Sequence, residues 1–213
     1  GTAGARHPCR GSRQARGVIG MVKVCGLTDR AAVEAAVAAG VDAIGFVFAP
    51  SVRRVSPARA AELSAGVPDS IRRVAVMQHP SSAEWLEVCA AFRPQVLQTD
   101  AADLAALAVP EQIECWPVFR EGGVDRAAKL PAIFLYEGQK SGQGETVDWQ
   151  DAARIAKRGR MILAGGLGID NVAAAIRAVR PWGVDVSSAV ESAPGKKDPE
   201  KIAAFVSAAR NAH

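Results

Sequence analysis

Residues Arg160–Lys197, RMILAGGLGIDNVAAAIRAVRPWGVDVSSAVESAPGKK, contain the pattern that decides the fold. The apolar run 161–164 breaks at the glycine pair 165–166, and apolar residues at helical spacing follow as far as Pro181. A second short apolar run, 184–186, ends in two serines. Strand, glycine turn, helix, strand and small polar turn form the repeating unit of a parallel α/β sheet.

Two small-residue turns in this stretch predict an anion site. Gly165 and Gly166 follow the first strand, and Ser187 and Ser188 follow the second. Neighbouring parallel strands end at the same edge, so the backbone N–H groups of both turns lie side by side, and glycine lets an anion approach closely. A glycine pair alone indicates only a tight turn. Together with the serine turn one unit later, it predicts a phosphate site, which in a barrel is usual after strands seven and eight.

Outward from this stretch, the same alternation of short apolar segments and helical patterns covers the chain from Met21 onwards. The expected strands are 22–27, 43–48, 74–77, 96–98, 115–119, 133–136, 161–164 and 184–186. The shortest expected helices are 101–107 and 124–129, and Thr28 is the expected cap of a helix over 30–39. Eight such repeats predict a single compact (β/α)8 TIM barrel over residues 21–213, with an open doubly wound sheet as the alternative.

Composition limits the partners of the protein. The chain has 213 residues, 49% of them hydrophobic, and lacks an apolar run of the roughly 18 residues that cross a membrane. Residues 1–20 hold four arginines and no acid, so they carry the whole net charge of +4 and leave the rest neutral, which argues against a nucleic-acid partner. This N-terminal extension is either a transit peptide or, as we favour, an added sequence or a start site placed before Met21.

The cysteines and histidines predict no metal or cofactor chemistry. Four cysteines, at positions 9, 25, 89 and 115, have no paired spacing, so neither a zinc site nor a disulfide framework is indicated. The three histidines are scattered along the chain. The pattern fits a reducing, cytoplasmic setting.

Reactive side chains gather at the predicted strand ends, where barrel enzymes carry their chemistry. They are Cys25, Arg53, Asp100, Glu137 and Asp185. A thiol and a carboxyl on opposite sides of a phosphosugar suit proton transfer at two different atoms, as in an isomerisation. Each also has a structural interpretation, since Cys25 fits a small core position, Arg53 a solvated loop and Asp185 a buried, hydrogen-bonded carboxylate.

Five motifs together resemble the phosphoribosylanthranilate isomerases of tryptophan biosynthesis. They are KVCGLTD at 23–29, SVRRVSP at 51–57, SGQGETVDW at 141–149, LAGGLGIDNV at 163–172 and VDVSSAVESAPGKKD at 184–198. The resemblance runs collinearly from Met21 to about Phe205. It implies a TIM barrel and a cofactor-free Amadori rearrangement of N-(5-phosphoribosyl)anthranilate to 1-(2-carboxyphenylamino)-1-deoxyribulose 5-phosphate.

The resemblance also implies roles for particular residues. The general base falls on Cys25, the general acid on Glu137, and the arginine that pairs with the anthranilate carboxylate on Arg53. Lys23, two residues before Cys25 on the same strand face, is either an electrostatic helper or an ion-pair residue at the barrel bottom. The phosphate-binding backbone falls on Gly165, Gly166, Ser187, Ser188 and Ala189.

Three departures from the family pattern affect these roles. The family reads Q-L-H-G after strand four, where this chain has Gln98-Thr99-Asp100-Ala101, and it is hydrophobic where this chain has Gln78 and His79. Glu137 replaces an aspartate, which moves the carboxyl about 1.5 Å outward, a shift on the scale that affects catalysis. Asp100 is therefore the reserve candidate for the acid.

Several functions remain open alongside the isomerase. They are another phosphosugar barrel enzyme, a bifunctional phosphoribosyl isomerase that also serves histidine biosynthesis, and a non-catalytic phosphoribosyl-binding barrel. Residues 21–110 contain no glycine pair to match the turn after strand seven, which argues against two phosphate sites. We expect a small-molecule phosphoribosyl substrate and a monomer or homodimer.

Overall fold

Eight parallel strands close into a barrel in chain order, with β1 paired to both β2 and β8. The computed structural model describes residues 19–125, 129–139 and 146–212. The closure confirms the predicted TIM barrel and excludes the open sheet. The strands are β1 Met21–Cys25, β2 Ala43–Val47, β3 Arg72–Val76, β4 Val96–Asp100, β5 Glu114–Arg120, β6 Ile133–Glu137, β7 Arg160–Leu163 and β8 Gly183–Val186.

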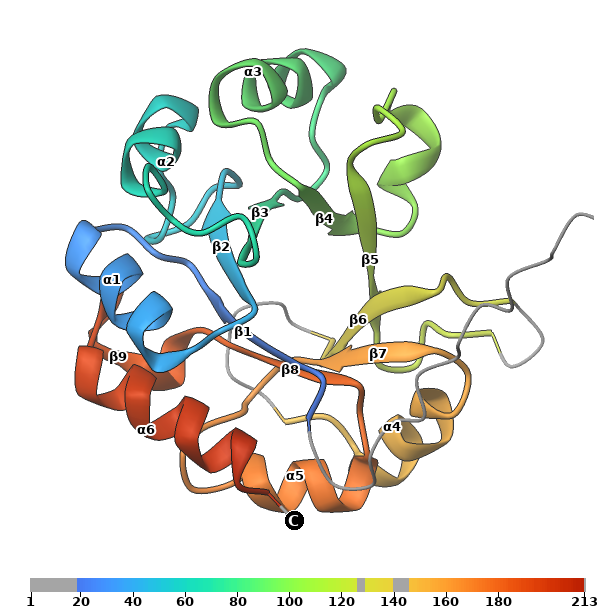
Figure 1. The fold of residues 1–213 in the computed structure, drawn as a ribbon. Coiled ribbons are helices and arrows are strands. Elements are labelled where there is room, and N and C mark those ends of the chain that lie inside the picture. The colour runs from blue at the N-terminus through green and yellow to red at the C-terminus, as the bar shows by residue number, and fades with distance from the viewer. Residues whose placement is uncertain (1–18, 126–128, 140–145, 213) are drawn as a thin grey trace, which may run out of the picture.

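The helices lie outside the strands (Figure 1). They are α1 Arg30–Ala39, α2 Pro57–Leu63, α3 Ser82–Phe92, α4 Trp149–Ala156, α5 Val172–Val179 and α6 Pro199–Arg210. Two short antiparallel strands, β9 Glu191–Ala193 and β10 Lys196–Lys197, form a hairpin between β8 and α6. In the ranges that the structure describes, no helix has the length and apolar character needed to span a bilayer.

The two shortest predicted helices are where the structure departs most from the sequence pattern. Segment 101–107 forms only a 3-10 turn, Asp103–Ala106. Segment 124–129 lies partly outside the described residues, and its described positions, Val124, Asp125 and Lys129, are not helical. A helix of six or seven residues gains few hydrogen bonds for the cost of its first turn, so a 3-10 turn or an irregular loop competes with it.

The cap of α1 also differs from the prediction. The Asp29 carboxylate accepts a hydrogen bond of 2.8 Å from the Ala32 amide, so Asp29 and not Thr28 is the N-cap. Thr28 lies one residue too early and instead donates its hydroxyl to the Gly195 carbonyl at 2.8 Å. It thereby ties the β1 loop to the β9–β10 hairpin. The predicted end at Gly40 is confirmed, with a left-handed φ of 79°.

Side chains alternate between the barrel interior and the layer under the helices, as the two-residue period of a strand requires. On β1, Met21 points inward, so Lys23 and Cys25 share its face. The lower interior is apolar and leaves the polar inward-facing groups at the C-terminal ends of the strands. Its buried members are Met21, Ala43, Val74, Val96, Trp116, Val118, Ile133, Leu135, Ile162 and Ala164.

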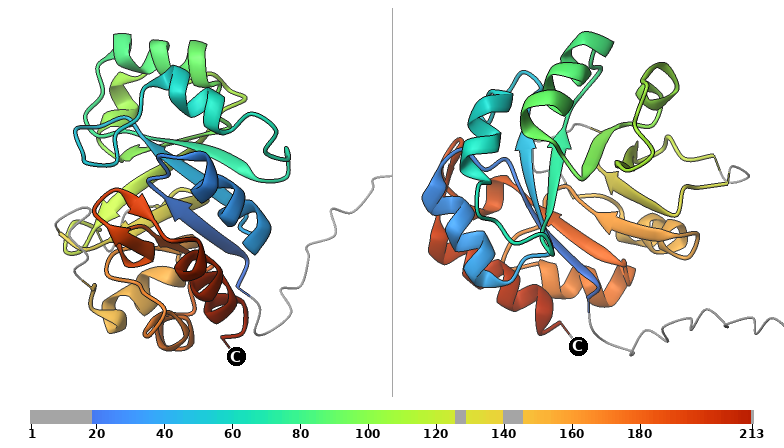
Figure 2. Two further views of the ribbon diagram at one scale, coloured as in Figure 1. Left: turned by 90° about the vertical axis from the view of Figure 1, so that its left-hand side faces the viewer. Right: turned by 45° about the horizontal axis from the view of Figure 1, so that its top comes forward.

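The seam of the barrel is the pairing of β1 with β8. Lys23 lies opposite Asp185 in this register, and the Lys23 Nζ is 2.9 Å from the Asp185 Oδ1. Outside the seam, α1 and α6 lie side by side (Figure 2). The first and last strands of the barrel are thus joined by backbone bonds, a buried ion pair and a helix pair.

The described end of the N-terminal extension packs on this seam. Ile19 is 4% exposed, and the Gly20 amide donates to the Trp182 carbonyl at 2.9 Å. The Ile19 carbonyl accepts from Arg210 at 3.0 Å. Residues 1–18 lie outside the described part. The contacts of the barrel domain therefore extend at least two residues before the predicted boundary at Met21.

Candidate active site

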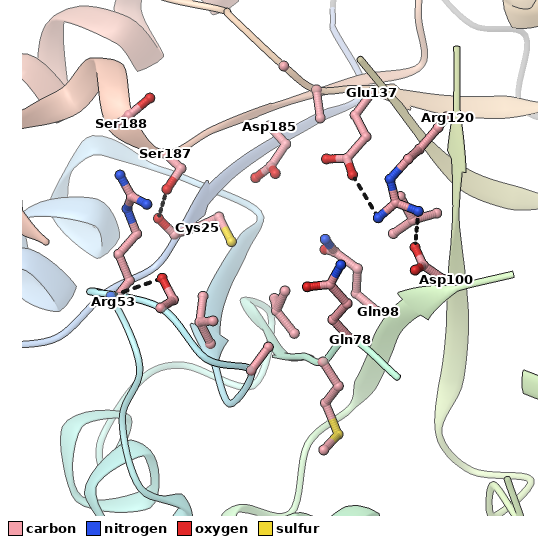
Figure 3. Close-up of a pocket in the computed structure, with 18 of the residues that line it drawn as sticks. Cys25, Arg53, Gln78, Gln98, Asp100, Arg120, Glu137, Asp185, Ser187 and Ser188 are labelled. Atoms are coloured by element: carbon pink, nitrogen blue, oxygen red, sulfur yellow. Dashed lines mark hydrogen bonds and ion pairs between the residues drawn. The ribbon is translucent and has the colours of Figure 1, made fainter. Parts of the chain in front are cut away.

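A pocket of about 200 Å³ opens at the C-terminal ends of the strands (Figure 3). It brings together most of the site residues predicted from the sequence, which come from β1, β4, β6, β8 and the loops after β2, β7 and β8. They are Cys25, Arg53, Asp100, Glu137, Gly165, Gly166, Asp185, Ser187 and Ser188. Ala189 is not among the lining residues. It is an exposed residue of the turn after β8 and lies near the β7 loop, where a Cβ on Gly168 would be 3.3 Å from the Ala189 Cβ.

The glycine turn after β7 has a fixed shape. Gly165 and Gly166 have φ of 85° and 61°, in the left-handed region that favours glycine. The Asn171 side chain holds the turn, since its Oδ1 accepts from the Gly168 amide and its Nδ2 donates to the Gly166 carbonyl, both at 2.8 Å. The backbone is therefore shaped for an anion before any ligand arrives.

The serine turn after β8 lies over a buried ammonium group. Lys197 is 4% exposed and donates to the Ser187 carbonyl at 3.0 Å. Ser187 donates its own hydroxyl to the Cys25 carbonyl at 3.1 Å, so the turn is also joined to β1. Burial lowers the pKa of Lys197, against the opposing effect of Glu191. The arrangement places a cation behind the predicted phosphate site.

Arg53 lies beside β1 and is held by a carboxylate of the β9–β10 hairpin. Its Nε and Nη2 donate to the two carboxylate oxygens of Glu191 at 2.7 and 2.9 Å, and neither bond uses Nη1. Gly26 makes room for the guanidinium stem, because a Cβ there would lie 2.6 Å from the Arg53 Cδ. Burial opposes charge on Glu191, but the hydrogen bonds from Arg53 and Lys197 outweigh it and lower its pKa. Arg53 is thus a fixed cation of the pocket and not a solvated loop residue.

Cys25 lies at the end of β1 with the buried Lys23–Asp185 pair beneath it. Gly45 on β2 faces this group, and a Cβ there would be only 3.1 Å from the Cys25 Sγ and 3.2 Å from the Lys23 Nζ. Burial raises the pKa of the Cys25 thiol, while Lys23 acts in the opposite direction. Burial also opposes charge on Lys23, but Asp185 and Cys25 outweigh it and raise its pKa. The thiol therefore has a permanent cation beside it.

The carboxyl groups of Glu137 and Asp100 lie across the pocket from Cys25, and Arg120 lies between them (Figure 3). The Arg120 Nη1 is 2.5 Å from the Asp100 Oδ1, and the Arg120 Nη2 is 3.5 Å from the Glu137 Oε1. Asp100 closes β4, two residues beyond the predicted end of that strand. The two candidates for the acid thus share one guanidinium.

Sequence reasoning did not assign four polar residues of the pocket to the site, which are Ser51, Gln78, Gln98 and Arg120. Strand alternation contained the signal for two of them, because Gln98 follows the inward-facing Val96 and Arg120 follows the inward-facing Val118 by two positions. Gln98 is 6% exposed, and its Oε1 has no hydrogen-bond partner among the described residues.

A cluster with the chemistry of a metal site lies beside Asp100. Ligand atoms of His79, Asp100 and Asp103 all lie within 4.8 Å of one another. Protein contacts already use them, since His79 Nδ1 is 2.9 Å from the Asp103 Oδ1 and Thr99 donates to the Asp103 Oδ2 at 2.7 Å. Together with the Arg120–Asp100 pair, these contacts explain why the acidic groups gather here.

A barrel mouth with an anion-shaped turn, a thiol beside a cation and a carboxyl on the opposite side is typical of (β/α)8 enzymes that move protons on phosphorylated sugars. The family model for N-(5'-phosphoribosyl)anthranilate (PRA) isomerase matches residues 22–208. The chain belongs to this family.

Individual relatives match along most of their length. A protein of Bordetella petrii named N-(5'-phosphoribosyl)anthranilate isomerase is 38% identical over 209 residues, which cover 90% of this chain and 95% of that protein. The crystal structure of TrpF from Jonesia denitrificans has 41% identity and a TM-score of 0.75, over 90% of this chain and 97% of that one. A phosphoribosyl anthranilate isomerase solved with reduced 1-(o-carboxyphenylamino)-1-deoxyribulose 5-phosphate has 29% identity and a TM-score of 0.71, over 89% and 97%.

Proposed function

We propose that this chain converts N-(5-phosphoribosyl)anthranilate to 1-(2-carboxyphenylamino)-1-deoxyribulose 5-phosphate, with Cys25 as the general base and Glu137 as the general acid. The observation that carries the proposal is that both side chains line one pocket, from β1 and β6, together with the two small-residue turns after β7 and β8. The names of the relatives support the same reaction, as does the reduced 1-(o-carboxyphenylamino)-1-deoxyribulose 5-phosphate held by one of the solved relatives.

The phosphate is expected at the turns formed by Gly165, Gly166, Ser187, Ser188 and the adjoining Ala189. Left-handed glycines expose backbone N–H groups there, and the Lys197 ammonium lies behind the serine turn. The sugar then extends across the pocket between Cys25 and Glu137. The anthranilate carboxylate is expected to bind the Nη1 of Arg53, because the two hydrogen bonds to Glu191 use only Nε and Nη2.

Two proton transfers by the protein convert the substrate to the enolamine. Glu137 gives its proton to the furanose ring oxygen as the C1′–O bond breaks and the nitrogen lone pair forms the Schiff base. Cys25, as the thiolate, then removes the C2′ proton, and the electron pair left behind forms the enolamine. Tautomerisation of the enolamine gives the ketone. The carbon that is reduced and the carbon that is oxidised belong to the same substrate, so the steps balance without an external redox partner.

The contacts favour Glu137 over Asp100 as the acid. Asp100 is paired with Arg120 at 2.5 Å, and its second oxygen is 3.5 Å from the His79 Nε2, so protein groups contact both of its oxygens. The Arg120–Glu137 separation is longer, at 3.5 Å. A proton donor must bring its carboxyl group to the substrate, and the tight contact with Arg120 holds the Asp100 carboxyl group in place. The segment Ser141–Gly144, which follows Glu137 in the sequence, lies outside the described residues.

Arg53→Ala is expected to raise KM by roughly tenfold or more with a smaller change in kcat, because a charged hydrogen bond to the substrate is lost in both ground and transition states. Steady-state kinetics measure the effect. Arg54→Ala is the matched control, since Arg54 is the neighbouring exposed arginine. A larger effect from Arg54→Ala shows that the wrong arginine has been assigned to the carboxylate.

Asn171→Ala is expected to raise KM several-fold and to lower the melting temperature by a few degrees. It removes both hydrogen bonds that shape the glycine turn, each of which contributes about 1 kcal/mol. The Asn171 side chain makes no cap hydrogen bond to α5, so the expected changes in KM and melting temperature do not come from a lost helix cap. An unchanged KM in a folded Asn171→Ala protein contradicts a phosphate site at this turn.

The activity itself is tested by following the fluorescence of phosphoribosylanthranilate with the purified protein. We expect substrate loss in proportion to enzyme concentration. Binding without turnover favours the non-catalytic alternative, and turnover of a histidine-pathway aminoaldose as well favours the bifunctional one. A cytoplasmic location and a monomeric or homodimeric state remain predictions.

A further inference from the structure

Arg120 lies between two carboxyl groups at the mouth of the pocket. It is the last residue of β5 and lies directly across from Glu137 in the β5–β6 register. In the β4–β5 register Asp100 lies opposite Val118, so Asp100 is the diagonal neighbour of Arg120 on the other side. The arginine therefore stands between two inward-facing carboxyl groups from the strands on either side of it.

The contacts of Arg120 are unequal. Its Nη1 is 2.5 Å from the Asp100 Oδ1, whereas its Nη2 is 3.5 Å from the Glu137 Oε1. The first is a tight charge-assisted hydrogen bond, and the second is a looser ion pair. Asp100 therefore determines where the guanidinium lies, and the guanidinium acts on Glu137 from that fixed position.

Asp100 is itself held in place from the outside. The His79 Nε2 is 3.5 Å from the Asp100 Oδ2, and Asp103 orients His79 by accepting from its backbone amide at 3.0 Å and contacting its Nδ1 at 2.9 Å. Hydrogen bonding to Asp103 raises the pKa of His79, which favours a cation facing Asp100. Thr99 in turn donates to Asp103 at 2.7 Å. The chain of contacts runs from the β3 and β4 loops to the mouth of the pocket.

The side chain of Glu137 is longer than that of the family's aspartate, so its carboxyl group needs a contact that fixes its position. The resemblance to the family implies an aspartate at this position, and the glutamate has one more rotatable bond. A longer carboxyl group samples more rotamers, and misplacement of a proton donor by about 1 Å lowers a rate by up to ~10²-fold. A fixed cation beside the carboxyl group restricts it to the rotamers that bring it near the guanidinium.

We propose that Arg120, anchored by Asp100, is the positioning residue that sets where the carboxyl group of Glu137 lies in the pocket. The inference rests on the proposed role of Glu137 as the acid. Asp100 then acts through Arg120 and does not itself exchange a proton with the substrate. This assigns a role to the unusual Asp100 that differs from its reserve role as the acid.

The test compares Arg120→Met, Arg120→Lys, Asp100→Asn and the Asp100→Asn/Arg120→Met double variant in steady-state kinetics. We expect Arg120→Met to lower kcat by about tenfold or more with KM changed by less than about twofold, because proton donation and not binding is affected. Arg120→Lys is expected to recover part of kcat, since an ammonium holds one carboxylate but does not bridge two as a guanidinium does.

The double variant separates positioning from direct catalysis. If Asp100 acts only by anchoring Arg120, Asp100→Asn has no further effect in the Arg120→Met background, and the two changes are strongly non-additive. The kcat–KM split and the partial recovery in Arg120→Lys are readouts that a general loss of packing does not reproduce.

Arg72→Met is the matched control. Arg72 pairs with Glu114 at 2.7 Å, and both residues begin their strands at the opposite end of the barrel, so kcat is expected to stay at the wild-type value. An unchanged kcat in Arg120→Met, or additive effects in the double variant, overturns the positioning role. If Arg120→Met does not fold, a wild-type kcat in Asp100→Asn overturns it equally. Absence of turnover in the wild-type protein marks failure of the proposed function instead.

Discussion

Cys25→Ser is expected to lower kcat by at least ~10²-fold, the usual scale for a positioned general base. The substitution keeps the size of the side chain, which is 7% exposed, so packing changes little. A serine hydroxyl does not ionise at working pH, whereas the thiol, with the Lys23 ammonium beside it, forms the thiolate as a minor species. Steady-state kinetics and the circular dichroism of the variant separate lost chemistry from lost folding.

The pH dependence of the wild-type protein gives this prediction a second measurement. Burial raises the pKa of the Cys25 thiol, so the thiolate is the minor form at neutral pH and grows as the pH rises. The thiolate of Cys25 therefore limits kcat/KM on the acid side, deprotonation of Glu137 lowers it as the pH rises, and a bell-shaped profile is expected. Cys89→Ser, on the half-buried outer cysteine of α3, is the control and should leave the profile unchanged. Near-normal turnover in Cys25→Ser shows that Cys25 is not the general base and only fills a core position.

Glu137→Gln is expected to lower kcat by ~10²-fold or more with KM little changed. Glutamine preserves the shape of the side chain but removes the transferable proton, so the loss appears in the transition state and not in substrate binding. Glu137→Asp retains part of the activity, since it keeps the acid but shortens its reach by about 1.5 Å, away from the position that Arg120 supports. The kcat–KM split of the two variants measures both effects.

Asp100→Asn decides between the two carboxyl groups. A positioning role for Asp100 predicts a partial loss similar to that of Arg120→Met. Complete loss in Asp100→Asn together with tolerance of Glu137→Gln places the acid on β4 and not on β6. The wild-type amide Gln98, two residues before Asp100 on the same strand face, shows that an uncharged amide is accommodated at this depth.

The barrel was predictable from the sequence because each strand is marked twice, by an apolar segment and by the small or polar residue that ends it. The glycine and serine turns after β7 and β8 indicated both the fold and the expected phosphate site. The errors fall where the signal is short or local. Thr28 and Asp29 are both residue types that cap helices, and the start of α1 at Arg30, which is also the predicted start, places the cap on Asp29.

The sequence predicted which residues lie at the strand ends of the site, but it did not predict the hydrogen bonds and ion pairs that join them. Cys25, Arg53 and Glu137 follow from position and from the motifs. The partners that hold them do not, because Arg53 meets Glu191 across 138 positions of sequence, and Arg120 meets Asp100 across 20. These contacts depend on strand register and on hairpin geometry, which a single sequence does not encode in any local pattern.

The seam between β1 and β8 makes catalytic competence a late product of folding. Lys23 and Asp185 are 162 positions apart, so the ion pair beneath Cys25 forms only when the most distant strands of the barrel meet. Closing so long a loop costs entropy that local contacts do not offset, which makes such pairings slow to form. An intermediate with seven strands in place has neither the carboxylate partner of Lys23 nor the serine turn. Such a folding intermediate is therefore chemically inert, however much native helix it already contains.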